Sequence, residues 1–231
     1  MNKVYREEKK FLINIEEFKK TSAFLDYFMM QDKHNGVNGY KIRSLYFDSI
    51  YDRDYFDKLD GLELRRKIRL RIYDTDTDFA MLETKQKQDK YQLKRSLRIT
   101  REDAERLIQC DYTPLLKYKE DFAAECYAVM KTEMYRPKTI VEYNRKAYIA
   151  KENSIRVTFD NNIVATETSF DLFSPNLVMN PVMDKFGVVL EVKFNGFLLE
   201  YIKSLLSDVN KSELSVSKYM LARQASYKYL I

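Results

Sequence analysis

Residues 65–73 read RRKIRLRIY, so three cations alternate strictly with three aliphatic residues. At the two-residue period of a β-strand, Lys67, Arg69 and Arg71 fall on one face and the aliphatic side chains fall on the other. A single strand of this kind indicates no more than the solvated face of a sheet.

The same alternation, with charge on one face, recurs in four further segments of the chain: at Arg6, Glu8 and Lys10, at Glu83, Lys85 and Lys87, at Lys94 and Arg98, and at Glu191 and Lys193. The repetition favours a sheet whose polar faces meet inside and whose apolar faces are covered by helices. A cation-lined interior of this kind attracts an anion.

The composition supports one domain over residues 1–231, because 45% of the residues are hydrophobic, enough for a sizeable core. The net charge of +5 comes from 40 basic and 35 acidic residues, a balance that does not favour nucleic acid as a partner. Only five glycines occur, and neither GxxxxGK[ST] nor GxGxxG is present. Any bound phosphate must therefore be held by side chains.

Cys110 and Cys126 have no metal-type partners nearby in the sequence, and His34 is the only histidine. A disulfide scaffold and a zinc site are therefore not expected, and a reducing cytosol fits. The N-terminal MNKVYREEKK lacks an apolar signal region, and no run of 18 uncharged apolar residues occurs. We expect a cytoplasmic protein without a transmembrane segment.

The periodicity predicts an α+β fold with about eight antiparallel strands that close into a barrel and with helices packed outside it. The expected strands cover residues 4–13, 40–47, 64–73, 79–86, 91–99, 139–150, 154–159 and 187–194. The expected helices run from Asn14 to about Gln31, with a capping box to Glu17, then over 51–58, from Thr100 onward, and over 113–131, 197–206 and 217–229.

The cations suit polyphosphate, because arginine forks make bidentate phosphate contacts and lysines add point charges. The candidates are Arg69, Arg71, Lys10, Lys85, Lys94 and Lys193, with Arg156 in SIRVTFD and Lys218 at a helix start. Ser217, next to Lys218, is explained more simply as an N-cap.

Glutamate and lysine stand two residues apart in three strands, with Glu8, Glu83 and Glu191 as the acidic members. One interpretation is cross-strand ion pairing, which needs no function. The other is a divalent metal, held by carboxylates, that bridges phosphate oxygens. The flanks GVVLEVKF favour the metal for Glu191, and both interpretations stay open for Glu8 and Glu83.

The ordered set YREEKKF, RSLYFD, RRKIRLR, LETK, KRSLR, EYNRKAY, RVTFD, LEVKF and SVSKYM resembles the VTC domain, the catalytic domain of vacuolar transporter chaperone polyphosphate polymerases. That family belongs to the triphosphate tunnel metalloenzyme (CYTH-like) superfamily. The resemblance spans Tyr5 to about Tyr227.

The resemblance implies an antiparallel β-tunnel that transfers the γ-phosphoryl of ATP to a growing polyphosphate chain and releases ADP, with Mn²⁺ or Mg²⁺ on Glu191. On matching positions the implied phosphate-binding residues are Lys10, Arg69, Arg71, Lys85, Lys94, Arg156 and Lys218. Lys193 and Arg145 are added from their strand face and motif position.

Two departures from the family pattern bear on function. The superfamily's triphosphatases and cyclases usually begin with ExExK, whereas Arg6 stands at the first glutamate, which favours the polymerase branch. Eukaryotic relatives also carry an SPX sensor and a membrane segment, and neither is expected here.

The leading hypothesis is a metal-dependent polyphosphate polymerase. Its alternatives are an inorganic triphosphatase of the same fold and a non-catalytic polyphosphate-binding subunit. Expected partners are ATP, polyphosphate or pyrophosphate, with a separate membrane protein as an option that would recruit the chain to the inner face of a membrane. Nucleic acid is not expected. Because no covalent nucleophile is needed, His34 is expected to be dispensable, whereas Arg69 and Glu191 are not.

Overall fold

The computed structural model describes residues 6–88, 91–207 and 217–228. The strands are β1 (Arg6–Asn14), β2 (Met30–Gln31), β3 (Tyr40–Asp48), β4 (Leu64–Ile72), β5 (Phe79–Gln88), β6 (Tyr91–Thr100), β7 (Arg136–Ile149), β8 (Arg156–Thr166), β9 (Asn180–Pro181) and β10 (Gly187–Asn195). The helices are α1 (Ile15–Phe28), α2 (Arg53–Leu59), α3 (Arg101–Ile108), α4 (Asp121–Thr132), α5 (Glu200–Ser207) and α6 (Lys218–Lys228), with short 3-10 helices η1 (Thr113–Lys117) and η2 (Glu152–Ser154).

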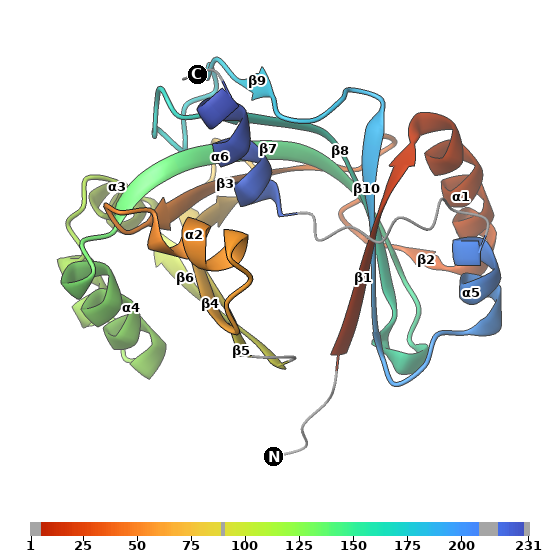
Figure 1. The fold of residues 1–231 in the computed structure, drawn as a ribbon, viewed down its shortest axis with the longest axis horizontal. Coiled ribbons are helices and arrows are strands. Elements are labelled where there is room, and N and C mark those ends of the chain that lie inside the picture. The colour runs from red at the N-terminus through yellow and green to blue at the C-terminus, as the bar shows by residue number, and fades with distance from the viewer. Residues whose placement is uncertain (1–5, 89–90, 208–216, 229–231) are drawn as a thin grey trace. The chain divides into compact units, whose positions relative to one another are not determined.

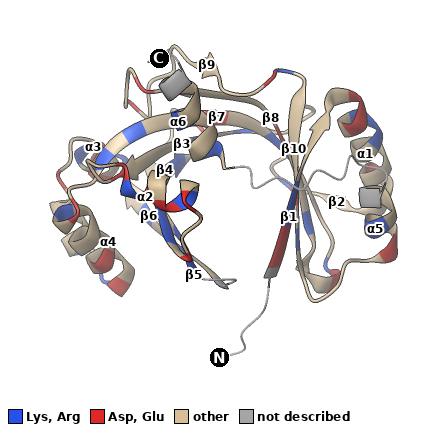
Figure 2. Ribbon diagram, viewed as in Figure 1, with Lys and Arg blue, Asp and Glu red and all other residues tan. Residues whose placement is uncertain are grey.

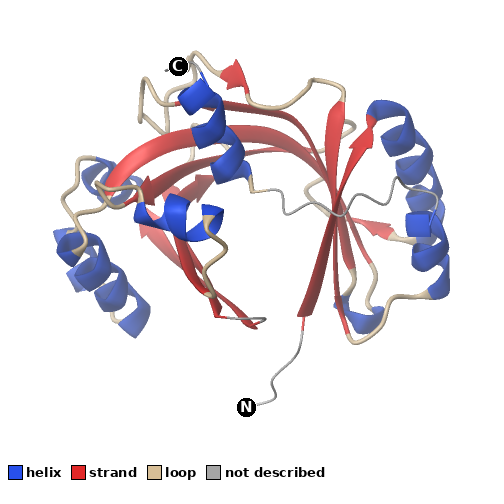
Figure 3. Ribbon diagram, in the orientation of Figure 1, coloured by secondary structure: helices blue, strands red, loops and turns tan. Residues whose placement is uncertain are grey.

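These elements confirm the predicted α+β class (Figure 3). The strand order is β1-β10-β8-β7-β3-β4-β5-β6, and β2 and β9 pair with β7 and β8 off this path. The eight strands on the path are the eight predicted ones, and the two short additional strands raise the number to ten. The pairs β1–β10, β10–β8, β3–β4, β4–β5 and β5–β6 are antiparallel. The hydrogen-bonded path is open, with β1 and β6 at its two ends, so among the described residues the predicted closure into a barrel is not found.

The chain divides into two compact units, each assembled from three segments. Unit 1 comprises Met1–Lys41, Tyr143–Val164 and Pro181–Leu221, and unit 2 comprises Ile42–Glu142, Ala165–Asn180 and Ala222–Ile231. Strands β3, β7 and β8 contribute residues to both units. The expected single domain over residues 1–231 stays a prediction.

In unit 1, the apolar side of the strands packs against α1 and α5 (Figure 1). Phe159 on β8 and Leu190 on β10 are fully buried in this core together with Leu25 of α1 and Ile202 of α5. Burial of each such side chain contributes roughly 1.5–3 kcal/mol. Because side chains alternate along a strand, the neighbours of these core residues lie on the opposite face of the sheet.

In unit 2, the apolar side of β4, β5 and β6 packs against α3 and α4 (Figure 1). Leu70, Leu82 and Ile99 supply one core residue from each strand, and Leu107 of α3 and Met130 of α4 cover them. The alternation seen in residues 65–73 thus separates a helix-covered apolar face from a charged face, as the sequence predicts.

The start of α1 confirms the predicted capping box. The side chain of Asn14 accepts a hydrogen bond from the Glu17 backbone N–H at 2.9 Å, and the Glu17 carboxylate accepts one from the Asn14 N–H at 2.8 Å. The helix ends at Phe28 and not near Gln31, because residues 30–31 extend and pair with β7 as β2.

Three further boundaries were predicted wrongly. The expected helix over 113–131 is divided into η1 and α4, because Tyr118 adopts an extended conformation with φ −81° and ψ 138°. The expected strand over 154–159 runs on to Thr166 as β8, through Asn162 with φ 49°. Helix α5 begins at Glu200, three residues later than expected. The predicted residues 4–5 and 229 lie outside the described residues.

Within the described ranges, no helix combines the length and the apolar character that crossing a membrane requires.

Candidate functional site

The predicted site residues fall into two groups, one on the charged face of each unit. Unit 2 carries Arg69, Arg71, Lys85, Lys94 and Glu83, and unit 1 carries the others: Lys10, Arg145, Arg156, Lys193, Ser217, Lys218, Glu8 and Glu191. Figure 2 shows the basic residues of unit 2 as blue segments on its strands. That the two groups enclose one common volume stays a prediction.

A row of three lysines crosses the charged face of unit 2. Lys67 on β4 stands directly opposite Lys85 on β5, and Lys85 stands directly opposite Lys94 on β6. Residues in such positions have Cβ atoms about 5 Å apart, and like charges there destabilise the sheet. A polyanion lying across the three strands would remove this repulsion.

The carboxylate of Glu83 contacts three cations of this face. Its Oε2 lies 2.7 Å from Nη2 of Arg69 and 3.6 Å from Nη1 of Arg71, and its Oε1 lies 2.5 Å from Nζ of Lys94. Arg69 also donates to the hydroxyl of Tyr46 at 3.0 Å. Both carboxylate oxygens of Glu83 thus act as counter-ions, and a metal-binding role for this residue stays a prediction.

These contacts determine the charge state of Glu83. Burial alone would raise the pKa of this carboxyl, but Arg69, Arg71 and Lys94 lower it to about 2. Burial lowers the pKa of the Lys94 ammonium; Glu83 opposes this effect, and the two arginines add to it. The carboxylate of Glu83 is therefore ionised near neutral pH and balances part of the positive charge of the cluster.

On the charged face of unit 1, lysines and glutamates alternate along and across β1 and β10. Glu8 stands opposite Lys193, and Lys10 stands opposite Glu191. Nζ of Lys10 lies 2.7 Å from Glu8 and 3.4 Å from Glu191, and Nζ of Lys193 lies 2.5 Å from Glu191 and 3.8 Å from Glu8. Cross-strand ion pairing of these residues is thus present in the structure.

The charged state of Glu191 is strongly favoured. Burial alone would raise the pKa of its carboxyl, but Lys193 and Lys10, helped by Arg145 and Lys218, hold that pKa well below its usual range. Burial works against the charge of Lys10 as well, and Glu191 and Glu8 raise the pKa of its ammonium. The ionised carboxylate of Glu191 therefore lies next to two lysines.

Asp160 on β8 joins two of the predicted cations. Its carboxylate accepts two hydrogen bonds from Arg145, from Nε and Nη2, both at 2.7 Å, and one from Nζ of Lys218 at 2.5 Å. The side chain of Asp160 is fully buried. The guanidinium of Arg145 and the ammonium of Lys218 also lie over the ring of Tyr143, 5.4 and 4.5 Å from its centre.

Ser217 occupies the start of α6. Its hydroxyl oxygen accepts a hydrogen bond from the backbone N–H of Met220 at 3.4 Å, which is the contact expected of an N-cap. A contact between Ser217 and phosphate stays a prediction.

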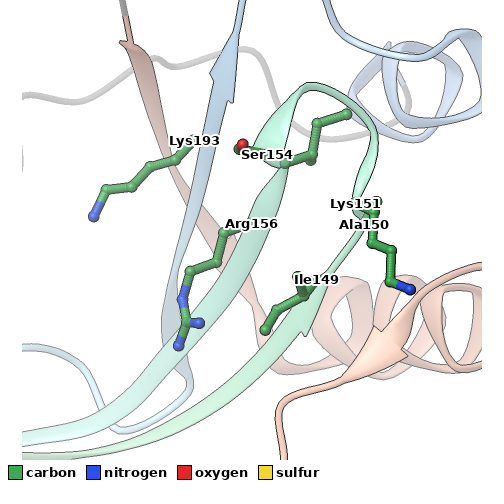
Figure 4. Close-up of a pocket in the computed structure, with 7 residues that line it drawn as sticks. Ile149, Ala150, Lys151, Ser154, Arg156 and Lys193 are labelled. Carbon is green, nitrogen blue, oxygen red and sulfur yellow. The ribbon is translucent and has the colours of Figure 1, made fainter. Parts of the chain in front are cut away.

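Arg156 is held from the side by residues of the β2–β3 region. Its Nη2 donates to Asp32 at 2.7 Å and to the hydroxyl of Tyr40 at 3.1 Å. Arg156 and Lys193 project to the same side of their strands and line a cavity of about 340 Å³ at the β7–β8 hairpin (Figure 4). Apolar residues, among them Ile149, supply most of its remaining lining.

The residues of unit 1 fit a hard divalent cation. Glu191 and Glu8 provide carboxylate oxygens, and the buried Oγ1 of Thr158, which stands directly opposite Glu191, has no hydrogen-bond partner. Among the described residues no three acidic, histidine or cysteine side chains gather as a metal cage. Mg²⁺ is usually held by one or two carboxylates together with substrate phosphates, so two glutamates suffice.

Sequence reasoning missed the side chains that orient the cations. Asp160 had a usable signal, because it lies four residues after Arg156 on the same face of β8. Tyr143 likewise stands two residues before Arg145 on β7. Asp32 lies in a loop, and nothing in the local sequence connects it with Arg156.

Comparison with solved structures supports the fold. A Bacillus halodurans protein provisionally described as an adenylate cyclase has a TM-score of 0.52 at 13% identity, covering 92% of this chain and 95% of its own. The PH1819 protein of Pyrococcus horikoshii has a TM-score of 0.50 at 14% identity, covering 96% of this chain and 99% of its own. At such identities the likeness concerns the fold alone.

Comparison with curated protein sequences gave no match. A family model described as the VTC domain matches residues 5–227, almost the whole sequence, and the motifs that carry the resemblance lie within this range. The chain therefore belongs to the VTC domain family.

Proposed function

We propose that this protein is a metal-dependent polyphosphate polymerase that transfers the γ-phosphoryl of ATP to a growing polyphosphate chain and releases ADP. Membership of the VTC domain family supports a triphosphate- or polyphosphate-handling activity in general. The observation that carries the proposal is the row formed by Lys67, Lys85 and Lys94, because cations aligned across three neighbouring strands match the regularly spaced charges of a polyanion.

The chemistry required of the protein is positioning and charge neutralisation. Phosphoryl transfer spreads negative charge over the oxygens of the transferred group, and fixed cations stabilise that charge. Arg69 and Arg71 are suited to hold phosphate oxygens by two-pronged contacts, while Glu83 keeps both guanidinium groups in place. No protein nucleophile is needed.

Glu191 and Glu8, with the Thr158 oxygen, would hold Mn²⁺ or Mg²⁺. When bound, the metal would neutralise negative charge on the phosphate groups. Lys10 and Lys193 contact the same carboxylates and would bind the neighbouring phosphates. We further propose a cytoplasmic location and delivery of the polymer to a separate membrane protein.

The test is to incubate the purified protein with ATP and Mn²⁺ or Mg²⁺ and to compare polyphosphate gels with ADP release. A ladder of products matched by ADP supports the polymerase. Phosphate release from tripolyphosphate without a ladder would instead assign a triphosphatase. Tight polyphosphate binding without turnover would assign a binding subunit.

Two variants make this test specific. Arg69→Ala should lose most synthesis, because it removes a fork that Glu83 and Tyr46 orient. His34→Ala is the control and should retain synthesis, because His34 is exposed in the β2–β3 loop and the mechanism needs no phosphohistidine. Loss of synthesis in His34→Ala would contradict the proposed mechanism.

A further inference from the structure

Asp160 is the most deeply buried carboxylate on the charged face of unit 1, with no exposed side-chain surface. It stands on β8 next to Phe159, which is buried in the core with α1 and α5, so the strand directs Asp160 to the opposite side. A buried carboxylate is costly unless cations and hydrogen bonds surround it. Here Arg145 and Lys218 meet that requirement.

The contacts of Asp160 set the direction of both cations. Arg145 uses Nε and Nη2 on Asp160, which leaves Nη1 outside this contact. Lys218 uses one of its three N–H donors, which leaves two outside it. The ring of Tyr143 lies beneath both groups and restricts their remaining movement.

Without Asp160 the two cations would repel each other at close range. Arg145 comes from β7 and Lys218 from α6, so the carboxylate is the group that joins them. A binding site needs its contacting groups held close to the productive geometry by supporting side chains.

We propose that Asp160 is a positioning residue that holds Arg145 and Lys218 as a preformed pair of phosphate-binding cations, an inference that rests on the proposed function. Asp160 itself touches no phosphate, and it acts through the two cations. This role differs from metal ligation, because all three contacts of its carboxylate are made to cationic nitrogen atoms.

The experiment measures tripolyphosphate binding by calorimetry in the presence of EDTA, where no metal contributes. Asp160→Asn should bind about tenfold more weakly or worse, the loss expected when a charge-assisted contact is removed. Asp160→Glu keeps the charge and should recover part of the affinity. An Asp160→Asn variant that binds normally in EDTA and is weakened only when Mg²⁺ is added would overturn the proposal in favour of a metal ligand.

Glu142→Gln is the matched control. Glu142 accepts a hydrogen bond at 2.7 Å from the buried Arg43, which donates also to backbone carbonyls of Leu172 and Ser174. This variant neutralises the carboxylate of a comparable ion pair, and neither member of that pair is one of the candidate site residues. It should lose thermal stability while its tripolyphosphate affinity stays normal, and an equal loss of affinity in both variants would overturn the proposal.

A double-mutant cycle separates positioning from general damage. If Asp160 acts through Lys218, adding Asp160→Asn to Lys218→Ala should cost much less affinity than Asp160→Asn alone. Fully additive losses would overturn the proposal. If Asp160→Asn fails to fold, Arg145→Lys serves instead. This variant keeps the positive charge but loses the two-pronged contact with Asp160. Unchanged tripolyphosphate affinity in Arg145→Lys would also overturn the proposal.

Binding without turnover also separates this inference from the proposed function. A wild-type protein that binds tripolyphosphate but makes no ladder would refute the polymerase and leave the Asp160 test valid. A wild-type protein that binds no tripolyphosphate would overturn both.

Discussion

Replacing Glu83 with glutamine should lower the free energy of unfolding and make the stability of the folded protein depend on a bound polyanion. The variant keeps the shape of the side chain but removes the negative charge that contacts Arg69, Arg71 and Lys94. Those cations would then face the remaining lysines of the row without the charge of Glu83 between them. Tripolyphosphate should supply the missing negative charge.

The magnitude follows from the pKa of Glu83, which the cluster lowers from 4.5 to about 2. At about 1.4 kcal/mol per pH unit, the ionised carboxylate contributes about 3 kcal/mol to the free energy of unfolding near pH 7. Because the folded pKa lies below the unfolded one, this contribution is complete above pH 4.5 and disappears as the pH falls toward 2. The difference in free energy of unfolding between wild type and Glu83→Gln should decrease as the pH falls over that range.

The assay is urea unfolding of both proteins near pH 7, with and without tripolyphosphate. Ligand should raise the stability of Glu83→Gln more than that of wild type, because it replaces the lost counter-ion. Glu125→Gln is the control: Glu125 pairs with Arg95 at 2.5 Å but is half exposed, so the change should cost less than about 1 kcal/mol. Equal unfolding of wild type and Glu83→Gln, or equal stabilisation of both by tripolyphosphate, would refute the reasoning.

Two further predictions concern other parts of the molecule. Burial and the nearby Asp48 raise the pKa of Asp54 to about 8, so the folded protein keeps a proton there that the unfolded chain releases near pH 3.8. The contribution of this group to the free energy of unfolding therefore falls as the pH rises from about 4 to about 8. Asp54→Asn should make the free energy of unfolding in urea less dependent on pH over this range. An unchanged pH dependence would contradict the raised pKa of Asp54. Gly39→Ala should lower both thermal stability and tripolyphosphate affinity, because its Cβ would lie 2.1 Å from the backbone oxygen of Arg145. Gly61→Ala, with a similar φ of +73° but open space around it, should cost only about 1 kcal/mol, and equal effects of the two would argue against the close contact.

Strand periodicity was sufficient to predict the α+β class and the charged faces. Lys67, Arg69 and Arg71 alternate with core residues of β4, so the position of the charged face follows directly from that of the core face. The same periodicity could not reveal β2, which has two residues and exists only because it pairs with β7. It also ended β8 too early, because Asn161 and Asn162 favour turns in isolation, whereas tertiary pairing keeps them in the strand.

The cations of the candidate site could be predicted from the sequence, whereas the carboxylates that pair with them could not. The two-residue period of the strands was enough to select Arg69, Lys94 and Lys193. A basic residue that alternates with core residues must lie on the other, charged face of the sheet. Which carboxylate each cation meets depends on strand register and on loops. Arg156 illustrates this point, because Asp32 reaches it from a distant loop.

The pairing of β1 with β10, which places Arg6 opposite Asn195, has a consequence for biosynthesis. A ribosome adding about 5–20 residues per second completes β1 about 10–40 s before it completes its partner. During that interval the apolar side of β1, with Phe11 and Ile13, has no β10 to pair with, although both residues are buried in the finished core. The nascent chain therefore carries β1 without its partner strand throughout that interval, when an unpaired apolar strand is prone to wrong pairing.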